Sequence, residues 1–183
     1  MNIKSVKRKN IILLGATGSI GENTLKIVEM YPSQFNIIGV SAHNNMNKMI
    51  KIAKQFSPEY VLFSDEKLNY KSLNDNIDSK LLFGSEGLKQ LASMKADIIV
   101  NGISGFAGLI PTLAAIEKGS IIAIANKESI VSCGPLLMEK CLHFKSKIIP
   151  IDSEHNAIFQ LMDKIRIKDI KEITITASGG PFI

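Results

Sequence analysis

The feature that most constrains the fold is a glycine-rich turn between a short apolar run and a segment with helical periodicity. Residues 15–21 read Gly-Ala-Thr-Gly-Ser-Ile-Gly, and they follow the apolar run at residues 10–14. Behind them, Leu25, Val28 and Tyr31 recur at helical spacing. Glycines let the backbone approach a phosphate, and a helix N-terminus offers free N–H groups. The turn therefore predicts a nucleotide site, although its spacing only approximates G-x-G-x-x-G and a tight turn without a ligand is the alternative.

The rest of the chain alternates between strands and helices. Strands are expected at residues 10–14, 35–40, 60–63, 80–83, 97–100, 121–125, 147–151 and 172–176. Helices are expected after the glycine turn and at residues 46–56, 86–93, 109–118, 135–144 and 153–162, with a short helix and a loop within 64–76. This alternation predicts an α/β fold: a Rossmann-like, doubly wound and mainly parallel sheet with helices on both faces.

The composition indicates which kinds of ligand and which cell compartment suit the chain. With 183 residues and a net charge of +5, the chain can form about one domain and suits anionic small molecules. Its basic cluster at residues 4–9 lacks interleaved aromatic side chains, so we expect no nucleic-acid partner. No run approaches the roughly 18 apolar residues that span a membrane. Cys133 and Cys141 are predicted to be free thiols, which favours a cytoplasmic protein.

Ligands of parallel α/β sheets bind beyond the carboxyl ends of the strands, so the segments after each strand are the places to search. Residues 41–45, after the second strand, read Ser-Ala-His-Asn-Asn and lack the acidic residue that usually binds the ribose of NAD. Neutral donors and the nearby Lys48 favour NADP instead. The alternative is that Asn44 or Asn45 only caps the following helix.

Two further strand ends carry glycine or polar residues. Residues 101–108 contain three glycines within the span 102–108, which suits a flat ligand such as nicotinamide but is equally compatible with an ordinary connection. Asn126, Lys127 and Glu128 follow a buried strand and are expected to reach the ligand edge of the sheet. A solvated Lys–Glu turn is the alternative for that segment.

The last strand end of interest holds two carboxylates. Asp152 and Glu154, separated by Ser153, can converge on a hard divalent cation. The alternative is that Asp152 or Ser153 caps the next helix and that Glu154 favours its dipole. His155 beside these acids is only weak evidence for a softer metal.

Taken together, these segments resemble the 1-deoxy-D-xylulose 5-phosphate reductoisomerase family along essentially the whole chain. The motifs that carry the resemblance are residues 15–21, Pro-Thr-Leu-Ala-Ala-Ile at 111–116, Ala-Asn-Lys-Glu-Ser at 125–129, Ile-Asp-Ser-Glu-His-Asn-Ala-Ile-Phe-Gln at 151–160, and Ala-Ser-Gly-Gly-Pro-Phe at 177–182. The resemblance implies an NADPH-binding domain at residues 1–151 and an incomplete start of an α+β catalytic domain at 152–183. It also implies NADPH- and metal-dependent isomerisation and reduction of a phosphorylated sugar, 1-deoxy-D-xylulose 5-phosphate, to 2-C-methyl-D-erythritol 4-phosphate in isoprenoid biosynthesis.

The resemblance also implies roles for individual residues. Cofactor contacts are implied for Thr17, Gly18, Ser19, Ile20, Asn45, Asn126 and Glu128. A Mg²⁺ or Mn²⁺ site is implied at Asp152 and Glu154, which with Lys127 form the implied catalytic set. Substrate contacts are implied for Lys127, Ser153, Glu154 and Ser178. A homodimer is implied for the full-length enzyme.

Two departures from the family pattern qualify these expectations. The family usually has Gly, then Lys or Arg, then Asn after the second strand, whereas here His43 and Asn44 precede the matching Asn45. Family members are also much longer, and two carboxylates are few for a cation that takes about six oxygen ligands. We therefore expect weak metal binding and no activity from this chain alone. A stand-alone NADP-binding module is the alternative; a semialdehyde dehydrogenase is disfavoured because Cys133 is poorly placed for a nucleophile.

Overall fold

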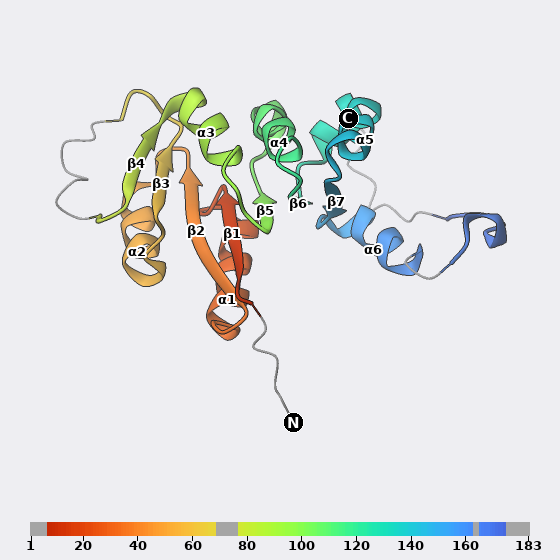
Figure 1. Ribbon diagram of the computed structural model, residues 1–183, viewed down its shortest axis with the longest axis horizontal. Helices are drawn as coiled ribbons and strands as arrows, with labels where there is room; N and C mark the ends of the chain where they lie inside the picture. Colours follow the sequence, from red (N-terminus) through yellow and green to blue (C-terminus); the bar gives the residue numbers. More distant parts are fainter. Residues whose placement is uncertain (1–6, 69–76, 163–164, 175–183) are drawn as a thin grey trace, which may run out of the picture.

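The computed structural model describes residues 7–68, 77–162 and 165–174. These residues form one sheet of seven parallel strands in the order β4-β3-β2-β1-β5-β6-β7 (Figure 1). The strands are β1 (Lys9–Leu14), β2 (Phe35–Ala42), β3 (Tyr60–Phe63), β4 (Lys80–Phe83), β5 (Ile98–Asn101), β6 (Ile121–Ile124) and β7 (Lys147–Pro150). The parallel Rossmann-like sheet predicted from the alternation is confirmed.

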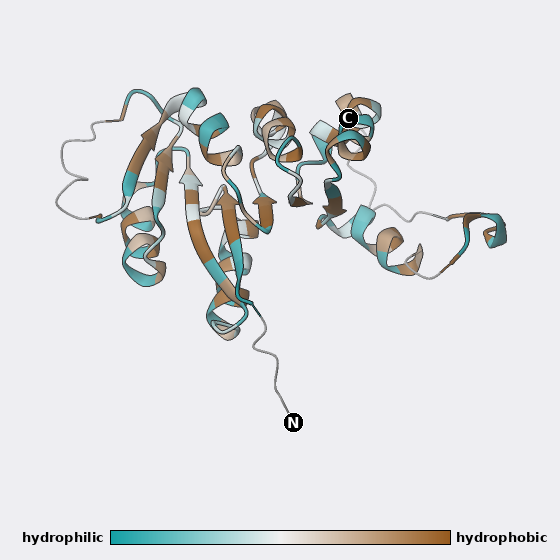
Figure 2. Cartoon of the chain, viewed as in Figure 1, coloured by the Kyte–Doolittle hydropathy of each residue, from teal (hydrophilic) through white to brown (hydrophobic). Residues whose placement is uncertain are grey.

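Strand β1 is the central strand of the sheet, and both of its faces are covered. Its side chains alternate, so Ile11 and Leu13 enter one core while Ile12 and Leu14 enter the other. All four are buried, which explains why the sequence shows a continuous apolar run rather than an alternating pattern. Figure 2 shows this apolar character along the central strands.

The helices divide between the two faces. The core on one face takes side chains from α1 (Ser19–Met30) and α2 (Met46–Phe56). The core on the other face takes them from α3 (Gly84–Ala92), α4 (Leu109–Ile116) and α5 (Lys127–Phe144). From β1 the chain runs outward through β2, β3 and β4, then crosses to β5, β6 and β7. The order therefore reverses between β1 and β5, where such sheets open a crevice for ligands.

The helix predicted at residues 135–144 is present as the part of α5 (Lys127–Phe144) that follows a kink, and the sequence analysis missed the part before it. Pro135 looks like the first residue of a helix, which is a position that proline favours. In the structure α5 already starts at Lys127 and is kinked at Cys133, whose φ of −134° is not helical. A proline inside a helix has no N–H to donate and crowds the preceding turn, so the kink falls just before it. Lys127 and Glu128 consequently lie in the first turn of α5 rather than in a free loop.

The last part of the described chain leaves the sheet. Helix α6 (Ser153–Met162) has no buried residue, and it is followed by the short 3₁₀ helix η3 (Ile167–Asp169). Both extend away from β7 (Figure 1). The strand predicted at 172–176 is wrong for residues 172–174, which have no regular structure and pair with none of the described strands. Residues 175–176, Ser178 and most of the loop predicted within 64–76 lie outside the described residues.

Candidate functional site

The glycine turn leads from β1 into α1 and is fixed to the end of β2. Gly15 has a φ of +82°, and a Cβ atom there would lie 3.0 Å from the carbonyl of Gly102. The amide of Gly15 donates to Ser41 Oγ at 3.0 Å, and the amide of Ala16 donates to Ser41 O at 2.7 Å. A Cβ on Gly21 would approach Ala16 to 2.5 Å. The first and last glycines are therefore required for close packing of strand, turn and helix.

Gly18 is different from the other two glycines. It is exposed, its φ is −85°, and a Cβ atom there would meet its nearest neighbour at an ordinary 3.6 Å. As the N-cap of α1 it provides no side chain to satisfy the first amides of the helix, and no other described side chain caps them. The exposed Gly18 and Ser19 therefore present a helix N-terminus that is suited to an anion.

Lys48 braces the glycine turn. Its Nζ donates to Thr17 O at 2.6 Å and also pairs with the carboxylate of Glu22 on α1. The hydrogen bond and the positive charge of Lys48 lower the pKa of Glu22. Lys48 was expected to help accommodate a 2′-phosphate, but in the structure its ammonium group contacts the turn and Glu22.

The segment after β2 contains a helix cap and a fixed histidine. Asn45 Oδ1 accepts from the amide of Lys48 at 3.2 Å, so the capping alternative for Asn45 is confirmed. Its predicted contact with the cofactor stays a prediction. His43 is exposed, and its Nδ1 lies 3.0 Å from Ser64 Oγ, beyond the end of β3.

Two buried asparagines hold the loop after β5, and only one of them was predicted as a site residue. Asn101 Nδ2 donates to Gly108 O at 3.0 Å and to Thr112 Oγ1 at 2.8 Å, while its Oδ1 accepts from the amide of Ile103 at 3.1 Å. Sequence reasoning missed Asn101. The available signal was a polar residue closing an otherwise apolar strand.

Asn126 holds the same loop through two backbone carbonyl groups. Its Nδ2 donates to Ile103 O and to Gly105 O, both at 2.6 Å, and its Oδ1 accepts from Ser129 N at 2.7 Å as the cap of α5. The residue is 2% exposed. Asn126 therefore shapes the site through the backbone of residues 103–105, and its predicted direct contact with the cofactor stays a prediction.

Two clefts open at the carboxyl ends of the strands, and they share one wall. The β2-side cleft, of about 620 Å³, is lined among others by Gly15, Thr17, His43, Ser64, Glu66 and Pro111. The β7-side cleft, of about 610 Å³, is lined among others by Ser19, Ile20, Lys127, Glu128, Asp152, Ser153 and Glu154. Both are lined by Gly18 and residues 102–104. The shared wall, residues 102–104, thus brings the predicted cofactor residues and the predicted metal residues to adjoining spaces.

One carboxylate oxygen of Asp152 caps α6, and the other has no hydrogen-bond partner among the described residues. Its Oδ1 accepts from the amide of His155 at 2.9 Å and lies 2.8 Å from His155 Nδ1. Its Oδ2 is buried without a hydrogen-bond partner among the described residues. Burial raises the pKa of Asp152, but the hydrogen bonds from His155 outweigh it and the pKa is lowered. The capping alternative is confirmed, and the unpartnered oxygen also fits a cation.

Glu154 is the second carboxylate of the β7-side cleft. Its Oε2 accepts from Ser153 Oγ at 3.0 Å. A hydrogen bond from its own amide, the Ser153 hydroxyl and the charge of Lys127 lower the pKa of Glu154. Within the described residues, no group of three or more His, Cys, Asp or Glu side chains is arranged to hold a metal. The donors present thus fit part of the shell of a hard cation.

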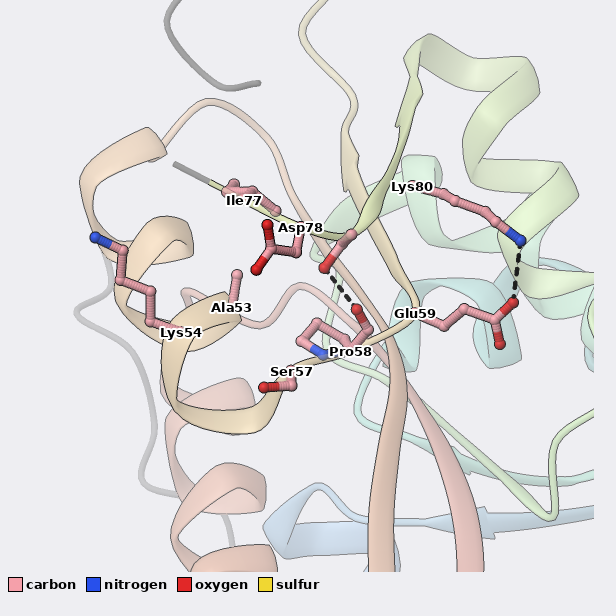
Figure 3. Close-up of a pocket in the computed structure, with 9 residues that line it drawn as sticks. Ala53, Lys54, Ser57, Pro58, Glu59, Ile77, Asp78 and Lys80 are labelled. Atoms are coloured by element: carbon pink, nitrogen blue, oxygen red, sulfur yellow. Dashed lines mark hydrogen bonds and ion pairs between the residues drawn. The ribbon is translucent and has the colours of Figure 1, made fainter. Parts of the chain in front are cut away.

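A third cavity lies at the opposite end of the strands and holds none of the predicted site residues. It has about 450 Å³ and lies between the end of α2 and the starts of β3 and β4 (Figure 3). Lys80 pairs with Glu59 at 3.4 Å, and Ser79 Oγ donates to Pro58 O at 2.5 Å. Ligands of parallel α/β sheets bind at the carboxyl ends of the strands, so we assign the site to the two clefts described above.

Sequence comparison matches two protein families, one after the other along the chain. Residues 11–134 match the 1-deoxy-D-xylulose 5-phosphate reductoisomerase family, and residues 148–183 match the family of the C-terminal domain of the same enzyme. The reductoisomerase of Clostridium acetobutylicum is 46% identical over 180 residues, and that of Thermodesulfovibrio yellowstonii is 42% identical over 175. Each alignment covers 95% of this chain and 46% of the relative, so the chain spans about half the length of these relatives.

Solved structures agree with the sequence comparison. The Zymomonas mobilis reductoisomerase in complex with NADPH has a TM-score of 0.80 and 37% identity, over 84% of this chain and 41% of that chain. A reductoisomerase in complex with NADPH, fosmidomycin and magnesium has a TM-score of 0.77 and 38% identity, over 83% and 38%. Among the described residues, no helix has the length and apolar character needed to cross a bilayer.

Proposed function

This chain belongs to the 1-deoxy-D-xylulose 5-phosphate reductoisomerase family, and we propose that it supplies the NADPH-binding part and the beginning of the catalytic site of such an enzyme. The observation that carries the proposal is the shared wall. It places the glycine turn and the Asp152–Glu154 pair on adjoining clefts. A cofactor that reaches from one cleft toward the other would bring its reactive end beside the two carboxylates.

The glycine turn would hold the cofactor phosphates. The exposed start of α1 at Gly18 and Ser19 offers amides that no described side chain caps, and Thr17 and Ile20 flank it. The shared wall would then support the rest of the cofactor, because Asn101 and Asn126 fix its backbone. When bound, NADPH supplies the hydride for reduction and the divalent cation polarises oxygens of the substrate.

The β7-side cleft would hold the cation and the substrate. Asp152 Oδ2 and the carboxylate of Glu154 are the oxygens proposed as ligands of Mg²⁺ or Mn²⁺. Lys127, whose charge acts on Glu154, and Ser153 would contact the phosphorylated sugar, while Glu128 would face the cofactor. Ser178 keeps its proposed role in binding the substrate phosphate, outside the described residues.

The proposal includes a division of the chain at residue 151. Strand β7 ends at Pro150, and α6, which follows, has no buried residue. We infer that residues 1–151 form the NADPH-binding domain and that 152–183 begin the catalytic domain. We further propose that this chain alone lacks activity, because Asp152 and Glu154 provide two carboxylates where a hard cation takes about six oxygens. We also propose that the full-length enzyme is a homodimer and acts in the cytoplasm. The two free cysteines support that compartment.

Calorimetric titration of the chain with NADPH, with and without Mn²⁺, tests the proposal. We expect NADPH to bind with little dependence on the metal, and Mn²⁺ to bind weakly. Asp152→Asn should keep the cap on α6, because one amide oxygen can still accept from His155, but it should abolish Mn²⁺ binding. Failure of NADPH to bind would overturn the proposal. Mn²⁺ binding that Asp152→Asn leaves intact would overturn the metal site alone.

A further inference from the structure

We propose that His43 and Ser64 form the element of this chain that recognises the 2′-phosphate of NADPH. The inference rests on the proposed function, in which NADPH occupies the β2-side cleft. It names two residues that take the place of the basic side chain usually found after β2 in this family.

The position of the pair fits the adenosine end of a dinucleotide. In dinucleotide-binding α/β domains, the residue beyond the second strand meets the ribose hydroxyls or a 2′-phosphate. His43 is the first residue beyond β2, and Ser64 is the first beyond β3. Because β2 and β3 pair in parallel up to Ala42 and Phe63, both side chains emerge at the same edge of the sheet. Both line the β2-side cleft together with the glycine turn.

Hydrogen bonds hold the two residues in register. The amide of Ser64 donates to Ala42 O at 3.0 Å, and the amide of Asp65 donates to His43 O at 3.1 Å. The side chains add a third contact, at 3.0 Å between His43 Nδ1 and Ser64 Oγ. The histidine ring is therefore oriented before any ligand arrives, which reduces the entropy lost on binding.

The chemistry of the pair suits a phosphate. With Nδ1 accepting the hydroxyl proton of Ser64, Nε2 carries the ring proton and is a donor. A hydrogen bond from this N–H to a phosphate is charge-assisted because the acceptor is ionised, and such hydrogen bonds are among the strong ones. Among the described residues that line the β2-side cleft, His43 alone has a basic side chain.

Two neighbouring candidates are engaged elsewhere. Lys48 Nζ donates to Thr17 O and pairs with Glu22. Asn45 Oδ1 caps α2. Glu66, the acidic residue of the same cleft, lies against Gly84 at the start of α3, where a Cβ atom on Gly84 would come within 2.5 Å of its carboxylate. These contacts favour His43 as the donor to the 2′-phosphate, with Ser64 orienting its ring.

The test measures nucleotide discrimination in the full 183-residue chain. Dissociation constants for NADPH and NADH, and for adenosine 2′,5′-bisphosphate and 5′-AMP, are compared by calorimetry in the wild type, His43→Ala, Ser64→Ala and His43→Arg. His143→Ala is the matched control, because it removes an exposed histidine from the far end of α5. Melting temperatures establish that each variant is folded.

We expect His43→Ala to weaken binding of NADPH and of the bisphosphate by about tenfold, the loss of one strong hydrogen bond. Binding of NADH and 5′-AMP should change by less than about twofold, and Ser64→Ala should give a smaller effect of the same sign. His43→Arg should restore the preference, which a purely structural role would not predict. An NADPH-to-NADH ratio that His43→Ala leaves unchanged, or a wild type without any preference, overturns this inference and leaves the proposed function standing. A wild type that binds neither nucleotide overturns both.

Discussion

The ammonium group of Lys48 lies 2.6 Å from the carbonyl oxygen of Thr17, and this hydrogen bond ties the first turn of α2 to the glycine turn. The same group pairs with Glu22 on α1. One side chain thus connects the two helices that cover one face of the sheet, at the point where the chain is expected to bind a phosphate.

The Lys48–Glu22 pair predicts a pH dependence of stability. Lys48 lowers the pKa of Glu22 below its ordinary 4.5 in the folded chain, so the pair stabilises the fold above that pH and loses this effect as the pH falls through the folded-state pKa. Glu22→Gln should therefore be less stable than the wild type at pH 7 and approach its stability at an acidic pH below the folded-state pKa of Glu22, as measured by urea denaturation. The exposed Glu139→Gln on α5 is the control. A difference between Glu22→Gln and wild type that is the same at both pH values would contradict the prediction.

The N-cap position of α1 separates helix stability from phosphate binding. Gly18→Asp fits the extended backbone and adds a good N-cap, so we expect the melting temperature to stay the same or rise. The new carboxylate would occupy and repel the proposed phosphate site, so NADPH affinity should fall by at least about tenfold. Gly18→Ala, which adds only a methyl group, should retain binding within about threefold. Equal NADPH binding by the aspartate and alanine variants would argue against a phosphate at this turn.

The buried asparagine that closes β5 should be important for stability. Asn101→Ala removes three hydrogen bonds and leaves the amide of Ile103 and the carbonyl of Gly108 without this partner. We expect the free energy of unfolding to fall by about 2–4 kcal/mol. Asn47→Ala, at an exposed position on α2, should change it by less than about 0.5 kcal/mol. Similar urea midpoints for the two variants would show that the loop is not held by Asn101.

The two cysteines should differ in reactivity. Burial raises the pKa of the Cys141 thiol, whereas Cys133 is half-buried at the kink of α5. Because the thiolate is the reactive form, iodoacetamide at pH 8 should label Cys133 first and reach Cys141 only when the chain unfolds. Mass spectrometry of the native and urea-denatured chain measures both rates. Rapid native labelling that persists in Cys133→Ser would contradict the assignment.

Much of the fold could be predicted from the sequence because β1 and its neighbours are short apolar runs between helical patterns. The seven strands of the sheet follow that alternation. The part of α5 before its kink at Cys133 was not predicted, because Pro135 carries the local signal of a residue that begins a helix and the helix after the kink does begin beside it. The strand predicted at 172–176 needs a neighbouring strand, which local pattern cannot supply.

Many residues of the candidate site could be predicted from the sequence, whereas the contacts that they make could not. Strand ends identified Asp152 and Glu154, but the split use of Asp152, with one oxygen capping α6 and one unpartnered, depends on three-dimensional geometry. Asn101 was missed because its partners lie in the loop and helix that follow it. The contact between His43 and Ser64 joins residues from two strand ends and emerges only from the register of β2 with β3.

The shared wall has a consequence for ligand binding in a complete enzyme. Residues 102–104 line both clefts, and Asn101 and Asn126 fix their backbone through the amide and the carbonyl of Ile103. Any shift of this backbone when one cleft fills changes the shape of the other cleft. Occupancy of the two clefts is then energetically coupled, and thermodynamic linkage makes that coupling reciprocal. In a complete enzyme, nucleotide binding would then change the affinity for metal and sugar, and metal and sugar would change the affinity for nucleotide by the same factor. In this chain alone, where the metal is expected to bind weakly, the coupling would have little effect on NADPH affinity.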